Sequence, residues 1–276
     1  MLIDTHIHLS YPSPEERERN LQAAKKVGAE AFIAVSENAE NSRRVVEAAE
    51  STDGLYCGVG VHPRQLHTYS PEDLDVFREL IKKSKKMVCI GECGLDYEGP
   101  LFGPHLTPEE REQQRQLFRD MIRLGREFGL PLNMHSDRPS FRDLLGILRE
   151  EKAYEIGGMM HNFQGSVDAA HEYLDMGFYI SASVTIHHPL ADRLRSVFTE
   201  ISIGQMLLDS DSPDYKLPRV GESQEPYPYD LDKVSEPRMV KYIAEKLAEL
   251  KGMPVEEVEA ITSLNARRLF SLPGRE

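Results

Sequence analysis

Histidine and carboxylate residues stand at or just past the ends of several apolar runs in this sequence. Imidazole nitrogens and carboxylate oxygens are ligands for divalent cations, and two such ions held side by side activate water for hydrolysis. The sequence therefore predicts a metal-dependent hydrolase. The six candidate ligands are His6 and His8 in I-D-T-H-I-H-L, Glu92 in I-G-E-C-G-L-D-Y, His135 in L-N-M-H-S-D, His161 in M-M-H-N-F-Q-G and Asp211 in L-L-D-S-D-S-P.

Glu92 is stronger evidence for a metal site than the H-x-H pair. His6 and His8 alternate along one strand and so face the same side, as does Asp4, yet a pair of this kind is also compatible with a structural role. Glu92 ends the apolar run 87–90, where an unpaired buried carboxylate would be strongly unfavourable. The ends of the other apolar runs offer histidines and acids but no lysine or arginine, which favours a metal ion as its partner.

The remaining candidates are ambiguous one by one. His135 and His161 each close an apolar run, and each alone is compatible with a hydrogen-bonded core histidine. Asp209 and Asp211 follow the last apolar run on one face, where two acids repel each other unless a cation lies between them. The six ligands together are far more specific than any one, because they recur in the same position of successive runs.

The elements that must position these residues form a repeating pattern. An apolar run, a polar loop and a segment with helical periodicity follow one another along the chain. Such alternation is typical of parallel strands with crossover helices, and a parallel barrel gathers the carboxyl ends of its strands around one rim. We therefore predict an α/β fold, a TIM-like (β/α)8 barrel. Its strands are expected at Leu2–Leu9, Ala31–Ser36, Leu55–His62, Met87–Leu95, Leu130–His135, Gly158–Asn162, Phe178–Ser183 and Met206–Asp209.

Three helix starts are recognisable from their capping residues. Ser13-Pro14, Ser70-Pro71 and Thr107-Pro108 each place a hydroxyl before a proline, with acids following in the first turn. The helix that starts at Thr107 is expected to end at Gly129, because glycine suits a helix C-cap. These features predict structure and carry no catalytic weight.

Two segments lack periodicity, Tyr97–Leu106 and Tyr215–Glu236, and we interpret them as walls of the active site. Only a helical tail, Pro237–Leu269, follows the second segment. Since α/β barrels of about 250 residues form one unit, residues 1–276 are expected to be a single domain.

Composition restricts the class of protein. The net charge of −13, from 33 basic and 46 acidic residues, argues against broad binding of duplex nucleic acid, although a local basic groove is compatible with it. Cys57, Cys89 and Cys93 form no C-x-x-C pair and fall in or beside predicted strands, which indicates buried thiols in a reducing compartment. No leader peptide or bilayer-length apolar run is found, so we expect a soluble, cytoplasmic protein without membrane partners.

These motifs resemble the TatD family of metal-dependent hydrolases, within the amidohydrolase superfamily. The resemblance spans nearly the whole chain and also includes G-V-H-P around His62, N-F-Q-G-S after His161 and N-A-R-R-L-F from Asn265. It implies a distorted TIM barrel with a two-metal centre, and several family members act as deoxyribonucleases. One ion would bind His6, His8, Glu92 and Asp211, and the other would bind His135, His161 and a bridging Glu92.

The resemblance also implies a mechanism. A hydroxide that bridges the metals would attack a phosphodiester, and Asp211 would also accept the proton of the water. Zinc is the expected metal, while magnesium, manganese, iron and nickel suit the same ligands.

His62 resembles a family histidine near the substrate phosphate; the alternative is a histidine that only satisfies the strand end. Arg64 is either a phosphate contact or a solvated loop arginine. Asp211, Glu92 and His62 are thus the expected catalytic residues.

Departures from the family pattern leave the substrate open. Asp209 stands where relatives often carry glutamate, Ser136-Asp137 separate His135 from Arg138, and the loop 219–226 is altered. Fewer cations at the mouth weaken the case for a long polyanionic strand.

Three functions therefore remain. The first is a phosphodiesterase acting on DNA or nucleotide ends. The second is a deacylase-like amide or ester hydrolase acting on a small or aminoacyl substrate, because the same hydroxide can attack a carbonyl. A non-catalytic barrel with a vestigial site predicts missing ligands, whereas all six are present.

Overall fold

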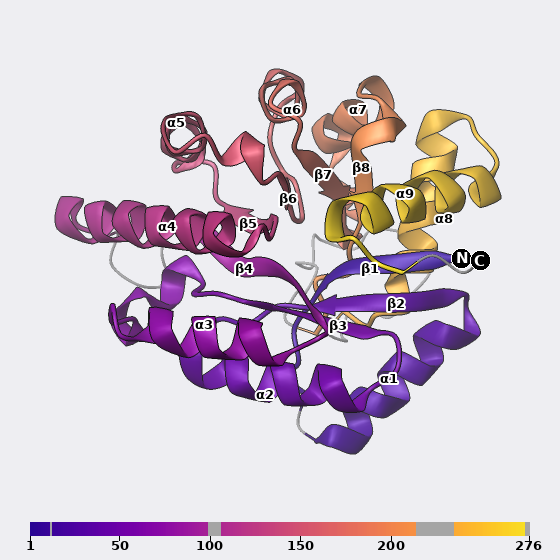
Figure 1. The fold of residues 1–276 in the computed structure, drawn as a ribbon. Coiled ribbons are helices and arrows are strands. Elements are labelled where there is room, and N and C mark those ends of the chain that lie inside the picture. The colour runs from indigo at the N-terminus through magenta and orange to yellow at the C-terminus, as the bar shows by residue number, and fades with distance from the viewer. Residues whose placement is uncertain (12, 99–105, 214–234, 274–276) are drawn as a thin grey trace.

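Eight parallel strands follow one another around a nearly closed barrel and alternate with helices (Figure 1). The computed structural model describes residues 1–11, 13–98, 106–213 and 235–273. The predicted TIM-like barrel is confirmed, and each predicted strand is found within a few residues of its expected bounds. The strands are β1 (Leu2–Ile7), β2 (Ala29–Ala34), β3 (Leu55–Val59), β4 (Met87–Leu95), β5 (Leu132–Ser136), β6 (Gly158–Met160), β7 (Tyr179–Ala182) and β8 (Met206–Leu208).

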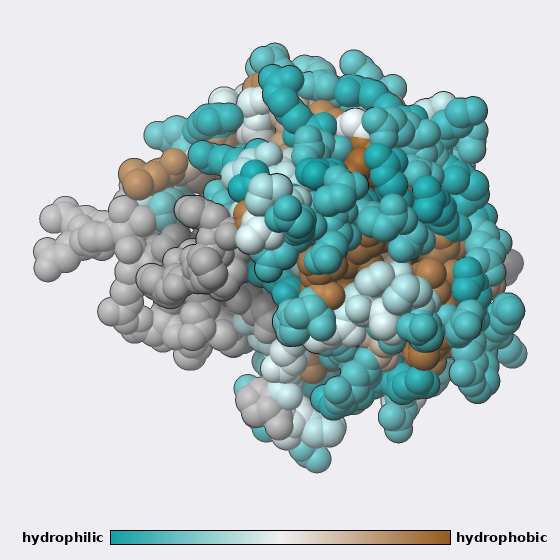
Figure 2. Space-filling model, turned by 90° about the vertical axis from the view of Figure 1, so that its left-hand side faces the viewer, coloured by the Kyte–Doolittle hydropathy of each residue, from teal (hydrophilic) through white to brown (hydrophobic). Residues whose placement is uncertain are grey.

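Helices surround the barrel, and these helices pack their apolar faces against the strands. On the side where α4 and α5 lie, the surface is mostly hydrophilic, with smaller hydrophobic areas between the charged side chains (Figure 2). No described helix is long and apolar enough to cross a membrane. The α-helices are α1 (Pro14–Lys26), α2 (Ala39–Ser51), α3 (Asp73–Lys83), α4 (Pro108–Phe128), α5 (Phe141–Glu150), α6 (Val167–Asp175), α7 (Asp192–Glu200), α8 (Met239–Lys251) and α9 (Val255–Phe270), and the short 3-10 helices are η1 (Pro63–Thr68), η2 (Ala153–Glu155), η3 (Val184–His187) and η4 (Ile203–Gln205).

The helix caps follow the sequence with one exception. Ser13 accepts a hydrogen bond from the backbone of Glu16, and Thr107 and Glu110 form a reciprocal capping box at the start of α4, which ends at Gly129 in the left-handed conformation. The predicted start at Ser70-Pro71 is wrong, because α3 begins at Asp73. The backbone N–H of Ser70 donates to the Asp73 carboxylate over 2.9 Å, so the intervening residues form a turn.

The predicted walls lie largely outside the described residues: 99–105 of the first segment and 215–234 of the second, including the altered loop 219–226. The predicted tail forms two helices, α8 and α9. All three cysteines are buried free thiols.

The barrel has one unsealed seam, between β1 and β8. In the described part of the chain these strands share no continuous ladder, and an isolated bridge joins Ile7 to Ser212. The backbone N–H of Asp211 donates to the carbonyl of His6 over 3.1 Å, and that of His8 donates to the carbonyl of Ser212 over 2.6 Å. The chain that leaves β8 thus crosses to the end of β1 and brings Asp211 beside the H-x-H pair.

The two ends of the barrel differ. A buried cluster of strand side chains, including Ile33, Cys89 and Leu207, packs against Phe270 of α9, separately from the core that faces the other helices. The hydroxyl of Ser263 on α9 donates to the Met1 carbonyl over 2.8 Å, so α9 covers the amino-terminal end of β1. The carboxyl ends of the strands face the opposite side, where the polar residues gather.

The close approach of β4 to β5 requires glycine at position 94. Gly94 has φ +140°, and a Cβ there would lie 2.0 Å from the carbonyl oxygen of His135. We expect Gly94→Ala to lower the free energy of unfolding by about 2 kcal/mol or more, because the strands must separate. Urea denaturation measures this change. Gly146→Ala on α5 is the matched control, since its Cβ meets no atom within 4 Å; equal stability of the two variants would contradict the argument.

A part-buried histidine links η3 to α8, and its burial should make the stability of the fold sensitive to acid. His187 Nε2 lies 3.2 Å from the Tyr242 carbonyl, and burial lowers the pKa of His187 from 6.5 to about 4. The proton therefore binds preferentially to the unfolded chain, so stability present above about pH 6.5 is lost as the pH falls toward 4. We expect His187→Gln to weaken this pH dependence in urea titrations and exposed His171→Gln to leave it unchanged. Identical pH profiles of wild type and His187→Gln would refute this assignment.

Candidate metal centre

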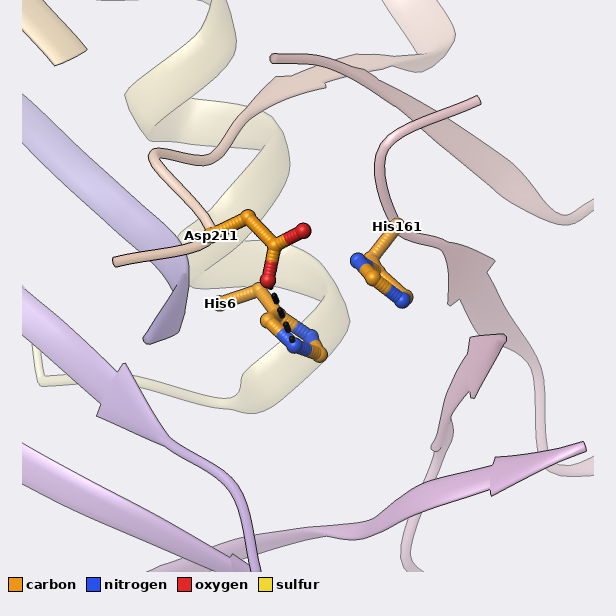
Figure 3. A group of neighbouring side chains, drawn as sticks. All are labelled: His6, His161 and Asp211. Carbon is orange, nitrogen blue, oxygen red and sulfur yellow. Dashed lines mark ion pairs between the residues drawn. The ribbon is translucent and has the colours of Figure 1, made fainter. Parts of the chain in front are cut away.

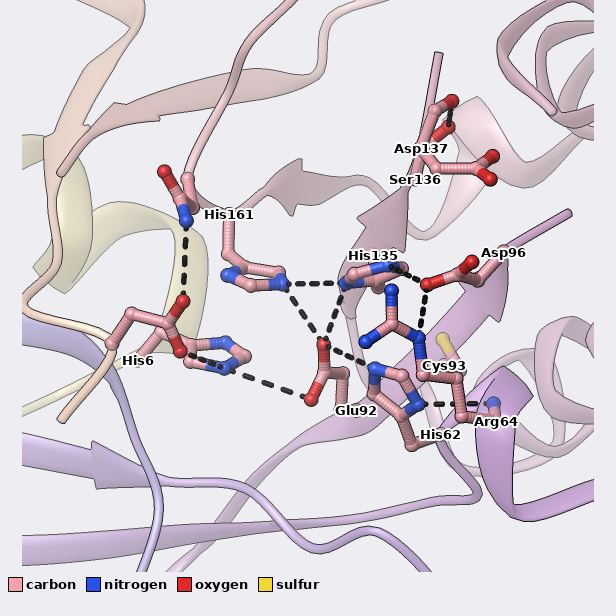
Figure 4. A network of polar contacts seen from close by, with 12 residues as sticks. His6, His62, Arg64, Glu92, Cys93, Asp96, His135, Ser136, Asp137 and His161 are labelled. Carbon is pink, nitrogen blue, oxygen red and sulfur yellow. Dashed lines mark hydrogen bonds and ion pairs between the residues drawn. The ribbon is translucent and has the colours of Figure 1, made fainter. Parts of the chain in front are cut away.

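The six predicted ligands meet at the carboxyl ends of β1, β4, β5, β6 and β8. Five of them line a cavity of about 960 Å³, and His6 is completely buried beside it. Figures 3 and 4 show side chains from opposite sides of the barrel pointing toward one another. Within the described chain, three overlapping groups of these side chains, one of them with His62, each place their ligand atoms within 4.8 Å of one another.

One set of ligand atoms surrounds the Oε2 atom of Glu92. His8 Nε2 lies 3.5 Å from this oxygen and 3.6 Å from Asp211 Oδ1. His6 Nε2 lies 3.8 Å and 3.7 Å from the same two oxygens. Two imidazole nitrogens and two carboxylate oxygens thus converge on one point.

A second set surrounds the other oxygen of the same carboxylate. Glu92 Oε1 lies 2.8 Å from His161 Nε2 and 3.2 Å from His135 Nδ1, and these two nitrogens are 3.2 Å apart. The imidazole of His161 stacks on that of His6 with ring centroids 3.8 Å apart, which places the two sets side by side. Glu92 therefore faces both sets at once, as the predicted bridging role requires.

The electrostatics keep both acids ionised. Burial alone would raise the pKa of Glu92, but neighbouring imidazoles, His161 and His135 among them, hold it well below its usual range. Burial is likewise outweighed at Asp211, where a hydrogen bond from His8 and the neighbouring His161 lower the pKa.

The histidines respond in opposite directions. Burial and the neighbouring His161 lower the pKa of His6 to about 3, so its imidazole is neutral. Burial opposes the charge of His135, yet Asp96 and Glu92 raise its pKa to about 10. A positive charge at this place is thus strongly favoured by the acids around it.

The donor set fits divalent metal ions. The Oε2 atom of Glu92 is buried and has no hydrogen-bond partner among the described residues, although the Nε2 atoms of His6 and His8 lie 3.8 Å and 3.5 Å from it. An unpaired buried carboxylate oxygen is unfavourable, and a cation would satisfy it. Histidine nitrogens with carboxylate oxygens are the ligands that zinc and similar metals take.

Asn133 orients a ligand and was missed by sequence reasoning. Its Oδ1 atom lies 2.9 Å from His6 Nδ1, while its Nδ2 donates to the Thr5 carbonyl over 2.9 Å. The amide therefore accepts the Nδ1–H of His6 and leaves the Nε2 lone pair for the cluster. Its position offered a signal, since Asn133 is a polar residue inside an apolar strand, two residues before His135.

Asn162, which follows β6, orients the carboxylate of Asp211. Its Nδ2 donates to Asp211 Oδ2 over 3.2 Å, and its Oδ1 accepts from the Thr185 hydroxyl over 3.0 Å. Asp211 Oδ1 is thereby left to face His6 and His8. Asp209 lies outside the three ligand groups and instead accepts hydrogen bonds from the Asn162 backbone and the Ser181 hydroxyl.

His62 satisfies the end of its strand, as the alternative reading expected, and its ring also faces the ligand cluster. It caps η1, where its Nδ1 accepts the backbone N–H of Arg64 over 3.0 Å, and its Nε2 lies 3.5 Å from Glu92 Oε1. Burial lowers the pKa of His62 to about 3, so the ring is neutral and carries its proton on Nε2, toward the cavity. Arg64 is paired with Asp96, its Nε lying 2.6 Å from Asp96 Oδ2, and is therefore not a free loop arginine.

Comparison with known proteins agrees with this geometry. A family model described as TatD related DNase matches residues 3–271. The chain belongs to the TatD family. It is 35% identical to YabD of Bacillus subtilis, named as an uncharacterized metal-dependent hydrolase, over 99% of this chain and 100% of the relative. It is 30% identical to the human protein named deoxyribonuclease TATDN3, over 98% and 94%.

The crystal structure of YjjV, a TatD homolog from Escherichia coli, superimposes with a TM-score of 0.84 at 30% identity, over 99% of this chain and 98% of that one. The family resemblance of the motifs is thus confirmed, and the chain is a TatD-family metal-dependent hydrolase.

Glu92 is the residue whose loss should affect metal binding most, because it faces both sets of ligands. We expect Glu92→Gln to weaken zinc binding at least about tenfold, since an amide is a poor substitute for a bridging carboxylate. Elemental analysis after dialysis and chelator competition measure this loss. The exposed Glu112→Gln serves as control, and wild-type zinc content in Glu92→Gln would rule out the bridging position.

Proposed function

We propose that this TatD-family chain is a two-metal phosphodiesterase that acts on DNA or nucleotide ends. The observation that carries the proposal is the carboxylate of Glu92, whose two oxygens face two different sets of imidazole nitrogens. The family model is described as a DNase, and one relative is named as a deoxyribonuclease, which supports the same substrate class. The histidine-rich donor set favours zinc.

The chemistry that bound divalent ions supply is a lowered pKa for water, from 15.7 to about 7, and Lewis acidity toward a phosphoryl oxygen. The residues of the chain supply the remaining functions. Asp211 is ionised at neutral pH and can accept a proton at Oδ1, because Asn162 occupies its Oδ2. His62 can donate its Nε2–H to a substrate oxygen and is kept from rotating by the cap that its Nδ1 makes.

The rim of the cavity offers cations for a phosphate. Arg138, Arg142 and Arg193 line the cavity, are exposed, and have no ion-pair partner among the described residues. Guanidinium groups bind phosphate oxygens through paired hydrogen bonds. They supply local positive charge in a protein of net charge −13.

A second candidate is an amide or ester hydrolase acting on a small or aminoacyl substrate. Acidic residues also line the cavity, among them Glu98 and the exposed Asp168. They favour a substrate that carries an ammonium group, and the same Lewis acidity would serve a carbonyl oxygen.

An assay with end-labelled single-stranded DNA and added zinc, manganese or magnesium tests the first proposal. We expect metal-dependent cleavage that falls at least about 100-fold in Asp211→Asn and Glu92→Ala, because proton transfer and metal binding are lost. The exposed Asp175→Asn is the control and should cleave as wild type does. No cleavage above the two site variants would refute the phosphodiesterase, and turnover of a panel of amides and aminoacyl esters would then favour the alternative.

A further inference from the structure

Asp96 is a buried carboxylate that lies next to the ligands without belonging to them. It follows β4 and has no measurable exposure. Its Oδ2 lies 3.1 Å from His135 Nε2 and 2.6 Å from Arg64 Nε (Figure 4). A carboxylate in this position accepts hydrogen bonds from an imidazole on one side and a guanidinium on the other.

The contact determines which nitrogen of His135 faces the centre. His135 Nε2 points to Asp96, while Nδ1 points to Glu92 Oε1 and to His161 Nε2, each 3.2 Å away. A ring whose Nε2–H is donated to a carboxylate presents the lone pair of Nδ1 to a metal. Rotation of the ring by half a turn would break the bond to Asp96.

Two further residues hold Asp96 itself. Gln114, a buried residue of α4, accepts the backbone N–H of Asp96 over 2.9 Å and donates to its carbonyl over 3.0 Å. The same amide donates to the carbonyl of Pro63 over 3.1 Å, next to Arg64. Gln114 thus ties the end of β4 to the start of η1, where Arg64 lies beside Asp96.

We propose that Asp96 is a positioning residue for the metal centre, which Arg64 and Gln114 hold so that His135 presents Nδ1 beside Glu92. Arg64 then acts on the centre through Asp96 and is not a substrate contact, although its side chain is 44% exposed and lines the cavity. The inference concerns metal binding and holds whichever bond the enzyme hydrolyses, so its failure is separate from failure of the proposed phosphodiesterase.

Zinc affinity at one fixed pH, measured by competition with a chromophoric chelator, tests the proposal without any substrate. We expect Asp96→Asn to weaken zinc binding about 10- to 100-fold, because the amide loses the charge that holds both partners. Arg64→Gln should cause a smaller loss in the same direction. The matched control is Asp143→Asn, whose carboxylate accepts from Tyr97 and Arg115 over 2.8 Å and 3.0 Å but touches no ligand; its zinc affinity should equal that of wild type.

A second measurement on the wild-type protein remains decisive if Asp96→Asn fails to fold. Long-range proton–nitrogen correlation spectra of the zinc-bound protein should show His135 coordinated through Nδ1, with its proton on Nε2. Coordination through Nε2 would overturn the proposal, as would wild-type zinc affinity in a folded Asp96→Asn. If a folded Arg64→Gln keeps wild-type zinc affinity, Arg64 does not act on the centre through Asp96 and the proposed network is wrong.

Discussion

The carboxylate of Glu92 is only 1% exposed and remains ionised. The side chains at the carboxyl ends of the strands are arranged around this buried negative charge. A buried charge is tolerated only where opposite charges and hydrogen-bond donors replace water. Here the replacement comes from imidazoles on both sides, with His8 facing one oxygen and His161 the other. A cation between these groups would satisfy the carboxylate more completely than any side chain in the surroundings.

The barrel meets this condition because parallel strands end on one rim. Glu92 comes from the fourth strand, while the H-x-H pair comes from the first strand and Asp211 follows the last. The seam between β1 and β8 brings these segments together, through backbone hydrogen bonds at His6 and His8. The irregular closure of this barrel is therefore tied directly to the placement of Asp211.

Three of the candidate ligands form a hydrogen bond, on the side away from the cluster, to a residue that fixes their orientation. Asn133 orients His6, Asn162 orients Asp211, and Asp96 contacts His135. Such partners matter because an imidazole has two nitrogens and a carboxylate two oxygens, so the identity of a ligand alone leaves its geometry undefined. The arrangement links the metal centre to residues as distant as Gln114 on α4.

The sequence by itself determined the strand order, the barrel and the set of candidate ligands. These follow from local patterns: apolar runs mark strands, and polar residues at their ends mark the rim. The predicted start of α3 was wrong because the Asp73 carboxylate accepts the backbone N–H of Ser70. At Ser13 and Thr107, by contrast, the hydroxyl accepts a backbone N–H from the first turn of the helix.

Only the tertiary structure decided which atoms meet. The partnership of His6 with Asn133 spans 127 residues, and that of Asp96 with His135 spans 39. Such contacts depend on the register between strands and on the closure at the seam. Both contacts join segments that are distant in the chain, so the residues around one partner do not reveal the other.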